Sequence, residues 1–256
     1  MKSAFAQYYT PTSREFAQLL TRALIVVDTS VLLNSFRASE RTTSELFEVL
    51  IAAKAQLWMP YHVGYEYHEN VDQTITEVML NRKKLSEAVR GKLNSIRIDI
   101  RNYRHPFLSE QLLETIDKYE RDLSQLIENE DELSNQLRRQ HAWARTQIQE
   151  LYGEANIGAS YSQQELTRIY EEGKRRQNDR IPPGFKDAEK AGPRKFGDFI
   201  IWRQMIDKAK ESKRDIVLVS DDAKEDWWLK IHGEKRGPLP ALRAEMKSES
   251  GQQFYA

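Results

Sequence analysis

Two short apolar runs, far apart along the chain, constrain what it can fold into. Residues 24–27 read Leu-Ile-Val-Val and residues 216–219 read Ile-Val-Leu-Val, with no alternating polar positions in either. Runs of this kind are typical of strands buried on both faces, as in a parallel sheet. Both runs stop at acids, because Asp28 follows the first, and Asp221 and Asp222 follow the second after one serine. We therefore expect a parallel sheet with carboxylates at one end of its strands.

Helix and strand alternate after the first run. A helix is expected after Asp28, with Thr29 or Ser30 as its N-cap. Residues 56–59 then predict a short second strand, which ends at Pro60 because proline lacks a backbone N–H. A further helix follows this proline.

The C-terminal part continues the alternation. Asp198 begins a helix that leads into the strand at 216–219, and a short helix and the start of a last strand follow in the tail. This order is typical of an α/β domain with a parallel sheet. A chain of 256 residues has room for one such domain with an insertion.

The expected insertion is helical. Apolar residues spaced by three and four predict two long amphipathic helices of coiled-coil type, which His105 and Pro106 separate into an antiparallel hairpin. A further charge-rich helix follows the hairpin. We expect residues 1–73 and 180–256 to form one domain and residues 74–179 to form the helical insertion.

Composition excludes several classes of protein. The chain has no cysteine, which rules out disulfides and thiolate metal sites and fits a reducing cytoplasm. The start of the chain lacks the apolar core of a secretion signal, and the longest aliphatic run is too short to span a membrane. Phosphate-binding glycine loops and the HExxH zinc motif are absent from the sequence. We expect a soluble cytoplasmic protein.

The acids predict a metal site. Parallel strands present their carboxyl ends at one edge, which brings Asp28 close to Asp221 and Asp222. Glu66 and Asp198 lie in the first turns of helices next to such strands, so both can reach the same edge. Carboxylates that converge repel one another unless a cation lies among them, and Mg²⁺ or Mn²⁺ fits oxygen ligands. Such ions activate water and neutralise a phosphodiester, so the pattern predicts phosphodiester hydrolysis.

Each acid also has a simpler reading. Asp28 is a candidate N-cap, Asp198 a first-turn acid favoured by the helix dipole, and Glu66 a surface residue. Asp221 and Asp222 are equally compatible with a solvated turn. Only their combination at the ends of both buried runs favours the metal site.

The residues beyond this pair have their own predictions. Glu225 and Asp226 are expected to serve the start of a helix and the surroundings of Trp227 and Trp228. Trp227 and Trp228 are expected to pack against the sheet rather than to stack on bases.

Taken together, these motifs resemble those of a known family. The segments VVDTSVLLN (26–34), Glu66, FGDFIIW (196–202) and LVSDDAKEDWW (218–228) resemble, in order, the four acidic motifs of the PIN domain nucleases. IPPGFKDAEK (181–190) is similar to the extra segment of a PIN-like branch that also carries a long helical insertion. The fold class implied is α/β, a three-layer PIN-like fold with a central parallel sheet and a long helical hairpin insertion.

The resemblance implies an endonuclease that depends on Mg²⁺ or Mn²⁺, with RNA favoured over DNA and one or two metal ions. The candidate catalytic residues are Asp28, Glu66, Asp198 and Asp222, and Asp221 joins them as a candidate metal ligand. The candidate site-supporting residues are Thr29, Ser30, Asn34, Asp187 and Lys190. Proteins of this branch occur in toxin-like or phage-defence settings. The family continues past the point where this chain stops, so we expect a fragment.

The basic residues leave several roles open. Lys plus Arg equals Asp plus Glu at 39 each, but residues 82–104 hold eight basic residues against two acids. The candidate nucleic-acid-binding residues are Lys174, Arg175, Arg176, Arg180, Lys186, Arg194 and Lys195. The insertion fits equally a self-packed solvated hairpin, a guide for a nucleic-acid backbone, and a surface for a homo-oligomer, a further domain or a partner. The alternative to a nuclease is a catalytically silent PIN-like binding module that uses this hairpin.

Overall fold

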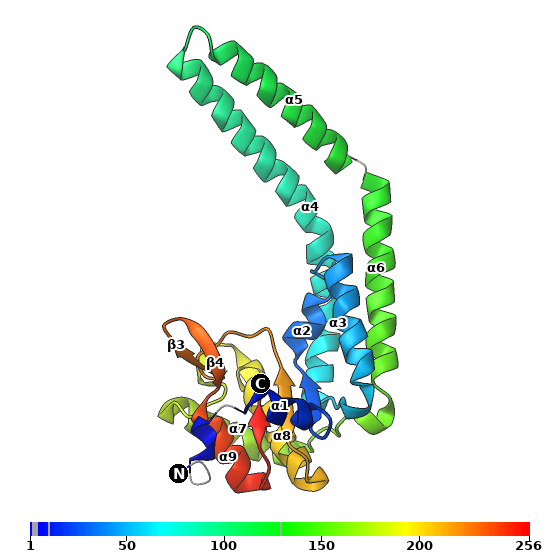
Figure 1. Ribbon diagram of the computed structural model, residues 1–256, viewed down its shortest axis with the longest axis vertical. Helices are drawn as coiled ribbons and strands as arrows, with labels where there is room; N and C mark the ends of the chain where they lie inside the picture. The colour runs from blue at the N-terminus through cyan, green and yellow to red at the C-terminus, as the bar shows by residue number, and fades with distance from the viewer. Residues whose placement is uncertain (2–4, 10, 129) are drawn as a thin grey trace. The chain divides into compact units, whose positions relative to one another are not determined.

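The computed structural model describes residues 1, 5–9, 11–128 and 130–256, without the side chains of residues 6, 82 and 126–131 (Figure 1). It divides into two compact units. The first unit comprises Met1–Asn70 and Thr146–Ala256, and the second comprises Val71–Arg145. All candidate acids lie in the first unit.

A parallel sheet forms the centre of the first unit. β1 (Leu24–Val27), β2 (Ile216–Val219) and β5 (Phe254–Tyr255) pair in the order β1-β2-β5, and both pairings are parallel. Val27 pairs with Val219, so Asp28 and Ser220 leave the sheet side by side at one edge. The predicted α/β fold with buried parallel strands is confirmed.

The predicted strand at 56–59 is wrong as a full strand. Leu57 makes one isolated parallel bridge with Ile25, and Met59 makes another with Ile157. This short segment turns from one neighbour to the other, since the Trp58 N–H bonds to β1 and the Met59 N–H bonds to Asn156. Pro60 then ends the pairing because it has no N–H to donate. The segment therefore extends the sheet edge without becoming a regular strand.

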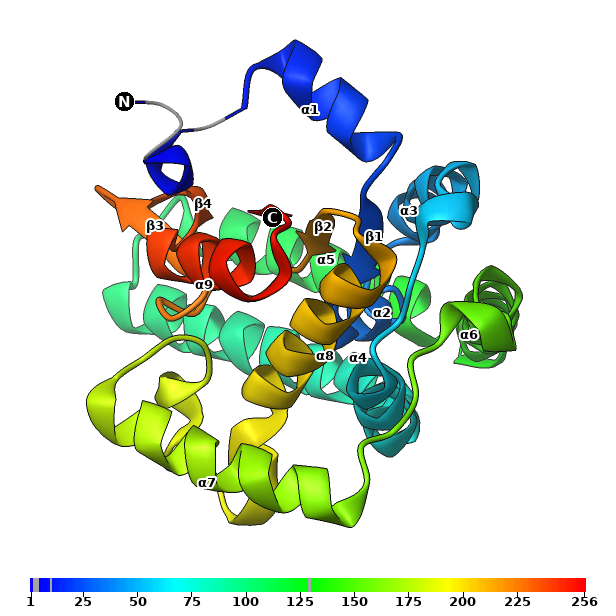
Figure 2. The same cartoon turned by 90° about the horizontal axis from the view of Figure 1, so that it is seen from below.

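Helices cover this sheet, and α8 is the most buried of those described. It spans Gly197–Ser212, carries Asp198 in its first turn, and contacts both α7 and α9 (Figure 2). The ring of Trp202 lies 4.9 Å from that of Phe254 and 6.0 Å from that of Trp227, so the predicted core packing of Trp227 is confirmed. The other helices here are α1 (Ser13–Leu20), α2 (Thr29–Asn34), α3 (Glu40–Ala52), α7 (Gln163–Asp179) and α9 (Pro240–Ser250). Short 3₁₀ helices span Ala6–Tyr8, Lys54–Gln56, Glu154–Asn156, Phe185–Asp187 (η4) and Gly192–Phe196.

A β-hairpin follows Trp227, where a helix start was expected. β3 (Trp228–Ile231) and β4 (Glu234–Pro238) are antiparallel. Their two-residue turn has positive φ angles, 51° at His232 and 83° at Gly233. Glycine adopts such angles at little cost, and hairpins favour turns of this hand. The His-Gly pair between two short strand-forming segments was the missed signal.

The second unit is helical. α4 (Tyr61–Tyr103) crosses the boundary from the first unit, and α5 (Ser109–Glu128) and α6 (Glu130–Leu151) follow. Arg97 of α4 forms ion pairs with Asp117 and Glu120 of α5, which joins the two helices of the predicted hairpin. The predicted second helix covers α5 and α6, which lie on either side of residue 129, and that residue is outside the described residues. In the described part of the chain, no helix is both long and apolar enough to cross a membrane.

The second unit ends at Arg145, whereas the sequence predicted that the helical insertion would extend to residue 179. α7 belongs to the first unit because Arg176, near its end, is buried there. The guanidinium of Arg176 pairs with Glu245 of α9, donates to the Pro182 carbonyl and lies 4.6 Å from the Phe199 ring centre. Arg176 is 4% exposed, so this candidate nucleic-acid-binding residue is instead part of the core.

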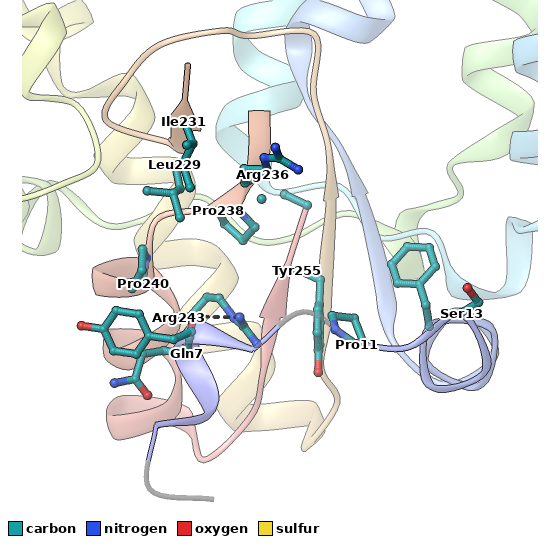
Figure 3. Close-up of a pocket in the computed structure, with 14 residues that line it drawn as sticks. Gln7, Pro11, Ser13, Leu229, Ile231, Arg236, Pro238, Pro240, Arg243 and Tyr255 are labelled. Atoms are coloured by element: carbon teal, nitrogen blue, oxygen red, sulfur yellow. Dashed lines mark hydrogen bonds between the residues drawn. The ribbon is translucent and has the colours of Figure 1, made fainter. Parts of the chain in front are cut away.

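A pocket of about 600 Å³ lies elsewhere in the first unit, between the N-terminal segment, the β3–β4 hairpin and Tyr255 of β5 (Figure 3). Arg243 of α9 anchors the N-terminal segment there by donating to the carbonyls of Gln7 at 2.8 Å and Tyr9 at 3.0 Å. None of the residues that line this pocket is a candidate acid. This pocket is therefore separate from the candidate acids.

Candidate active site

Asp28 ends β1 with its carboxylate held by two serines. Its position is the N-cap of α2, yet its side chain makes no capping hydrogen bond. Instead Oδ2 accepts a hydrogen bond from Ser30 Oγ at 2.6 Å and from Ser220 Oγ at 2.8 Å. Burial raises the pKa of Asp28, the two serine hydroxyls oppose that rise, and the charge of Glu66 adds to it. The carboxylate is thus oriented by a serine of α2 and by the serine that follows β2.

Glu66 of α4 approaches the same edge. Thr29 Oγ1 donates to Glu66 Oε2 at 3.0 Å, and His62 Nε2 lies 3.5 Å from Oε1. The negative charge of Glu66 raises the pKa of both Asp28 and Asp198, so it acts on the two acids together. Glu66 therefore lies close enough to Asp28 and to Asp198 for its charge to act on both carboxylates.

Gly197 provides the space that Glu66 occupies. A Cβ at position 197 would lie 2.5 Å from Glu66 Oε1 and 3.4 Å from His62 Nε2. The distance to Glu66 Oε1 is too short for a real contact, whereas that to His62 is an ordinary van der Waals distance, so Glu66 is the flexible partner that must move. The glycine of the FGD motif thus fixes how near Glu66 comes to the start of α8.

We expect Gly197→Ala to displace the Glu66 carboxylate while the fold persists. A shift of about 1 Å at a catalytic group costs about a hundredfold in rate, so cleavage by the variant should fall by that order. Its melting temperature should stay close to that of the wild type. Gly153→Ala is the matched control, because a Cβ there meets nothing within 4 Å. Full cleavage by Gly197→Ala would contradict a role for Glu66 in the reaction.

Lys224 lies among three carboxylates, one of which is that of Asp198. Its Nζ lies 2.8 Å from Asp198 Oδ2, 2.9 Å from Asp187 Oδ2 and 3.3 Å from Asp222 Oδ2. Sequence reasoning missed this residue, although it is the lysine of the DDAKEDWW motif. Asp198 starts α8, Asp187 ends η4 and Asp222 follows β2, so one ammonium group joins three separate segments.

The charges of this cluster are strongly coupled. Burial raises the pKa of Asp198 to about 7, against the opposing effect of Lys224. Burial would lower the pKa of Lys224, but Asp198 and Asp187 outweigh it, and the net pKa is raised. Burial would likewise raise the pKa of Asp187, but hydrogen bonds from Lys190 and Lys224 make the net pKa lower. Lys224 is therefore held as a cation.

The two adjacent aspartates face different ways. Asp222 contacts Lys224 by its side chain, and its Oδ1 also accepts a hydrogen bond from the Lys224 N–H at 2.8 Å. Asp221 is exposed, and its Oδ2 accepts a hydrogen bond from Asn34 Nδ2 at 2.9 Å. Asp222 thus belongs to the cluster around Lys224, and Asp221 belongs to a network with α2.

The IPPGFKD segment is tied to the site by Asp226. This side chain is fully buried, and its Oδ2 accepts hydrogen bonds from the N–H groups of Gly184 at 2.9 Å and Lys186 at 3.0 Å. The expectation that Glu225 and Asp226 serve a helix start is therefore wrong. Glu225 pairs with the Lys186 ammonium at 2.7 Å. Asp226 thus holds the loop that presents Asp187 to Lys224, and Glu225 adds only an exposed ion pair.

The remaining candidate basic residues are exposed or half-buried, and several have partners. Arg175 pairs with Glu172, Arg180 lies over the Phe185 ring and Lys195 over the Phe196 ring. Lys174 and Arg194 are exposed. The structure thus leaves these side chains at the surface, in contrast to Arg176.

The donor set has the chemistry that Mg²⁺ and Mn²⁺ prefer, because it consists of hard carboxylate oxygens. Within the described residues, however, no three His, Asp or Glu side chains form by themselves a group that could hold a metal ion. On one side of the cluster, the Lys224 ammonium lies between the carboxylates of Asp187, Asp198 and Asp222. The carboxylate oxygens fit a divalent ion, and the positive charge of Lys224 lies beside them.

Acids at the carboxyl ends of parallel strands lie where open α/β domains bind their ligands. The profile of the PIN-like domain family matches residues 24–242, most of the chain. The chain belongs to this family. PIN domains are generally hydrolases that cleave nucleic acids and use divalent metal ions. No curated protein and no solved structure matches the chain.

Proposed function

We propose that the protein is a metal-dependent endonuclease that hydrolyses phosphodiester bonds, most of all in RNA. One observation carries the proposal, namely the set of contacts that links the carboxylates of Asp28, Glu66, Asp198 and Asp222 to one edge of the sheet. Serines and a threonine orient two of them, and Lys224 joins the other two. Stability alone gives a protein little reason to gather like charges in this way.

Asp28, Glu66, Asp198 and Asp222 are the residues that we propose to hold Mg²⁺ or Mn²⁺. When bound, the ion would neutralise charge on the phosphodiester and lower the pKa of a water that attacks phosphorus. Ser30 and Ser220 fix the rotamer of Asp28, and Thr29 does the same for Glu66. Asn34 supports Asp221, and Lys190 supports Asp187. These contacts reduce the freedom that each ligand would lose on binding the ion.

The finer parts of the proposal rest on the resemblance of the motifs. They are the preference for RNA over DNA, a toxin or phage-defence setting and a cytoplasmic location. Exposed basic residues such as Lys174 and Arg194 are candidates for contacts with a nucleic-acid backbone. The helical hairpin is available for the same purpose, for self-association or for a partner.

The metal requirement gives a direct test. We expect total RNA to be cleaved in Mn²⁺ and left intact when a chelator is added, with single-stranded DNA cleaved more slowly or not at all. Mn²⁺ should also raise the melting temperature, since a ligand at a hundredfold excess over its Kd stabilises the folded state by about 2.7 kcal/mol. Mapping the ends of the products would show cleavage within the chain.

Two variants complete this test. Asp28→Asn keeps an acceptor for Ser30 and Ser220 but loses the charge, so it should lose both cleavage and the Mn²⁺-dependent rise. Glu225→Gln changes an exposed acid that pairs with Lys186 and should keep both. RNA binding without cleavage or metal stabilisation would instead support the catalytically silent binding module.

A further inference from the structure

Lys224 has more acidic partners than a structural ion pair needs. An ammonium group has three N–H donors, and three carboxylates from three segments lie within 3.3 Å of this one. The side chain of Lys224 is 27% exposed, and that of Asp198 is 18% exposed. The Lys224 side chain is therefore mostly covered by protein, and part of it is in contact with solvent.

The cations of the site are unevenly distributed. Lys190 contacts Asp187 at 2.8 Å, so Asp187 has two lysines. On the other side, Asp28 accepts hydrogen bonds from neutral serine hydroxyls and Glu66 from a neutral threonine hydroxyl. Among the described residues, neither acid has an ion pair with Lys or Arg. Glu66 has His62 Nε2 at 3.5 Å, but Asp28 and Glu66 lack the lysine contacts that Asp187, Asp198 and Asp222 have.

We infer that Lys224 takes the place of a second metal ion, so that the centre binds one divalent cation, on the side of Asp28 and Glu66. In two-metal nucleases, two cations about 4 Å apart clamp the oxygens of the phosphodiester. Here the Nζ of Lys224, held by Asp187 and Asp222, would supply one of these positive charges. Of the four acids proposed as ligands, Asp222 would then hold Lys224 instead of the ion, and Asp198, which contacts Nζ, would also help to hold the ion. This inference rests on the proposed function and adds the number of ions and the role of Lys224.

The chemistry gives the two cations different roles. The metal side would activate water, as proposed above, whereas an ammonium donates hydrogen bonds and neutralises charge on a phosphate oxygen. Lys224 would therefore act on the substrate by its charge, because its three N–H donors already face carboxylates. Asp187 is a positioning residue, because it reaches the substrate only through Lys224.

The number of Mn²⁺ ions bound per chain tests the inference without requiring turnover. Electron paramagnetic resonance or calorimetric titration should give one ion for the wild type. Lys224→Met should give two, because Asp187, Asp198 and Asp222 then form a second oxygen site. It should also bind its first ion about tenfold more tightly, because a nearby positive charge has been removed.

Lys190→Met is the matched control. Its ammonium contacts Asp187 but neither Asp198 nor Asp222, so the count should remain one. Lys224→Arg keeps the positive charge and should also bind one ion. Circular dichroism of each variant would check folding, and if Lys224→Met does not fold, the wild-type count decides.

Each other result would overturn the inference. Two ions in the wild type, with RNA cleavage, would leave the nuclease standing and exclude a substitute role for Lys224. One ion in folded Lys224→Met would make the lysine a structural cross-link only. No bound ion together with no cleavage would refute both the inference and the proposed function.

Discussion

Asp198→Asn is expected to slow phosphodiester cleavage by about a thousandfold, the order of several kcal/mol that a metal ligand contributes in the transition state. Asp198 interacts both with Lys224 and with Glu66. Its Oδ2 contacts Lys224 at 2.8 Å, and its carboxylate is close enough to Glu66 for their charges to interact. Asparagine has nearly the same shape but no charge to hold a cation.

The fold of this variant should survive. The substitution removes one negative charge from a group in which Glu66 and Asp187 both act on Asp198, which offsets the weaker contact with Lys224. Single-turnover cleavage of a labelled RNA in Mn²⁺, with the melting temperature measured alongside, would check both statements. Asp207→Asn is the matched control on the same helix, because its half-exposed carboxylate lies outside the cluster. Asp198→Asn with full activity would exclude Asp198 as a metal ligand.

The edge where the acids meet could be predicted because it depends on local patterns. An apolar run without polar alternation indicates a strand buried on both faces, and the parallel pairing of Val27 with Val219 then places Asp28 beside Ser220. The helix at Asp198 and the core position of Trp227 follow from the same kind of pattern. Each of these features is encoded within a few residues.

The partners of individual charges could not be predicted in this way. Arg176 lies in a basic stretch, yet its guanidinium is buried against Glu245 and Phe199. Lys224 and Asp226 follow a strand end in the sequence, but their partners lie in a loop about forty residues earlier. Nothing in the spacing of charges tells which of several lysines meets which acid, because the tertiary fold decides this. For the same reason, the sequence could not predict that Asp222 contacts Lys224 and that Asp221 contacts Asn34.

Asp226→Ala is expected to have the largest effect on stability. The Asp226 carboxylate is fully buried and accepts hydrogen bonds from two backbone N–H groups, of which Gly184 N lies in a buried residue. Removing it leaves these donors without their charged acceptor and should cost about 3 kcal/mol. For a chain of this size, the melting temperature should fall by roughly 6–12 °C. Chemical denaturation and thermal unfolding would measure both quantities.

The loop should respond before the whole domain does. Without Asp226 the IPPGFKD segment loses its attachment, so trypsin should cut after Lys186 faster than in the wild type. Asp226→Asn should be intermediate, because its carbonyl oxygen can still accept both hydrogen bonds. Its amide would, however, stand where Oδ1 has no hydrogen-bond partner in the described structure. Glu225→Gln, next to it and exposed, should leave the melting temperature unchanged.

The same variant separates the loop from the acids that it approaches. Asp226 binds the backbone of the loop, which carries Asp187 and lies against Asp198, so a loss of cleavage in folded Asp226→Ala would act through the position of this loop. We expect cleavage to fall by about tenfold, less than for Asp198→Asn, because Lys224 keeps its contacts with Asp198 and Asp222. Unchanged trypsin sensitivity and an unchanged melting temperature would show that the loop is held by other contacts.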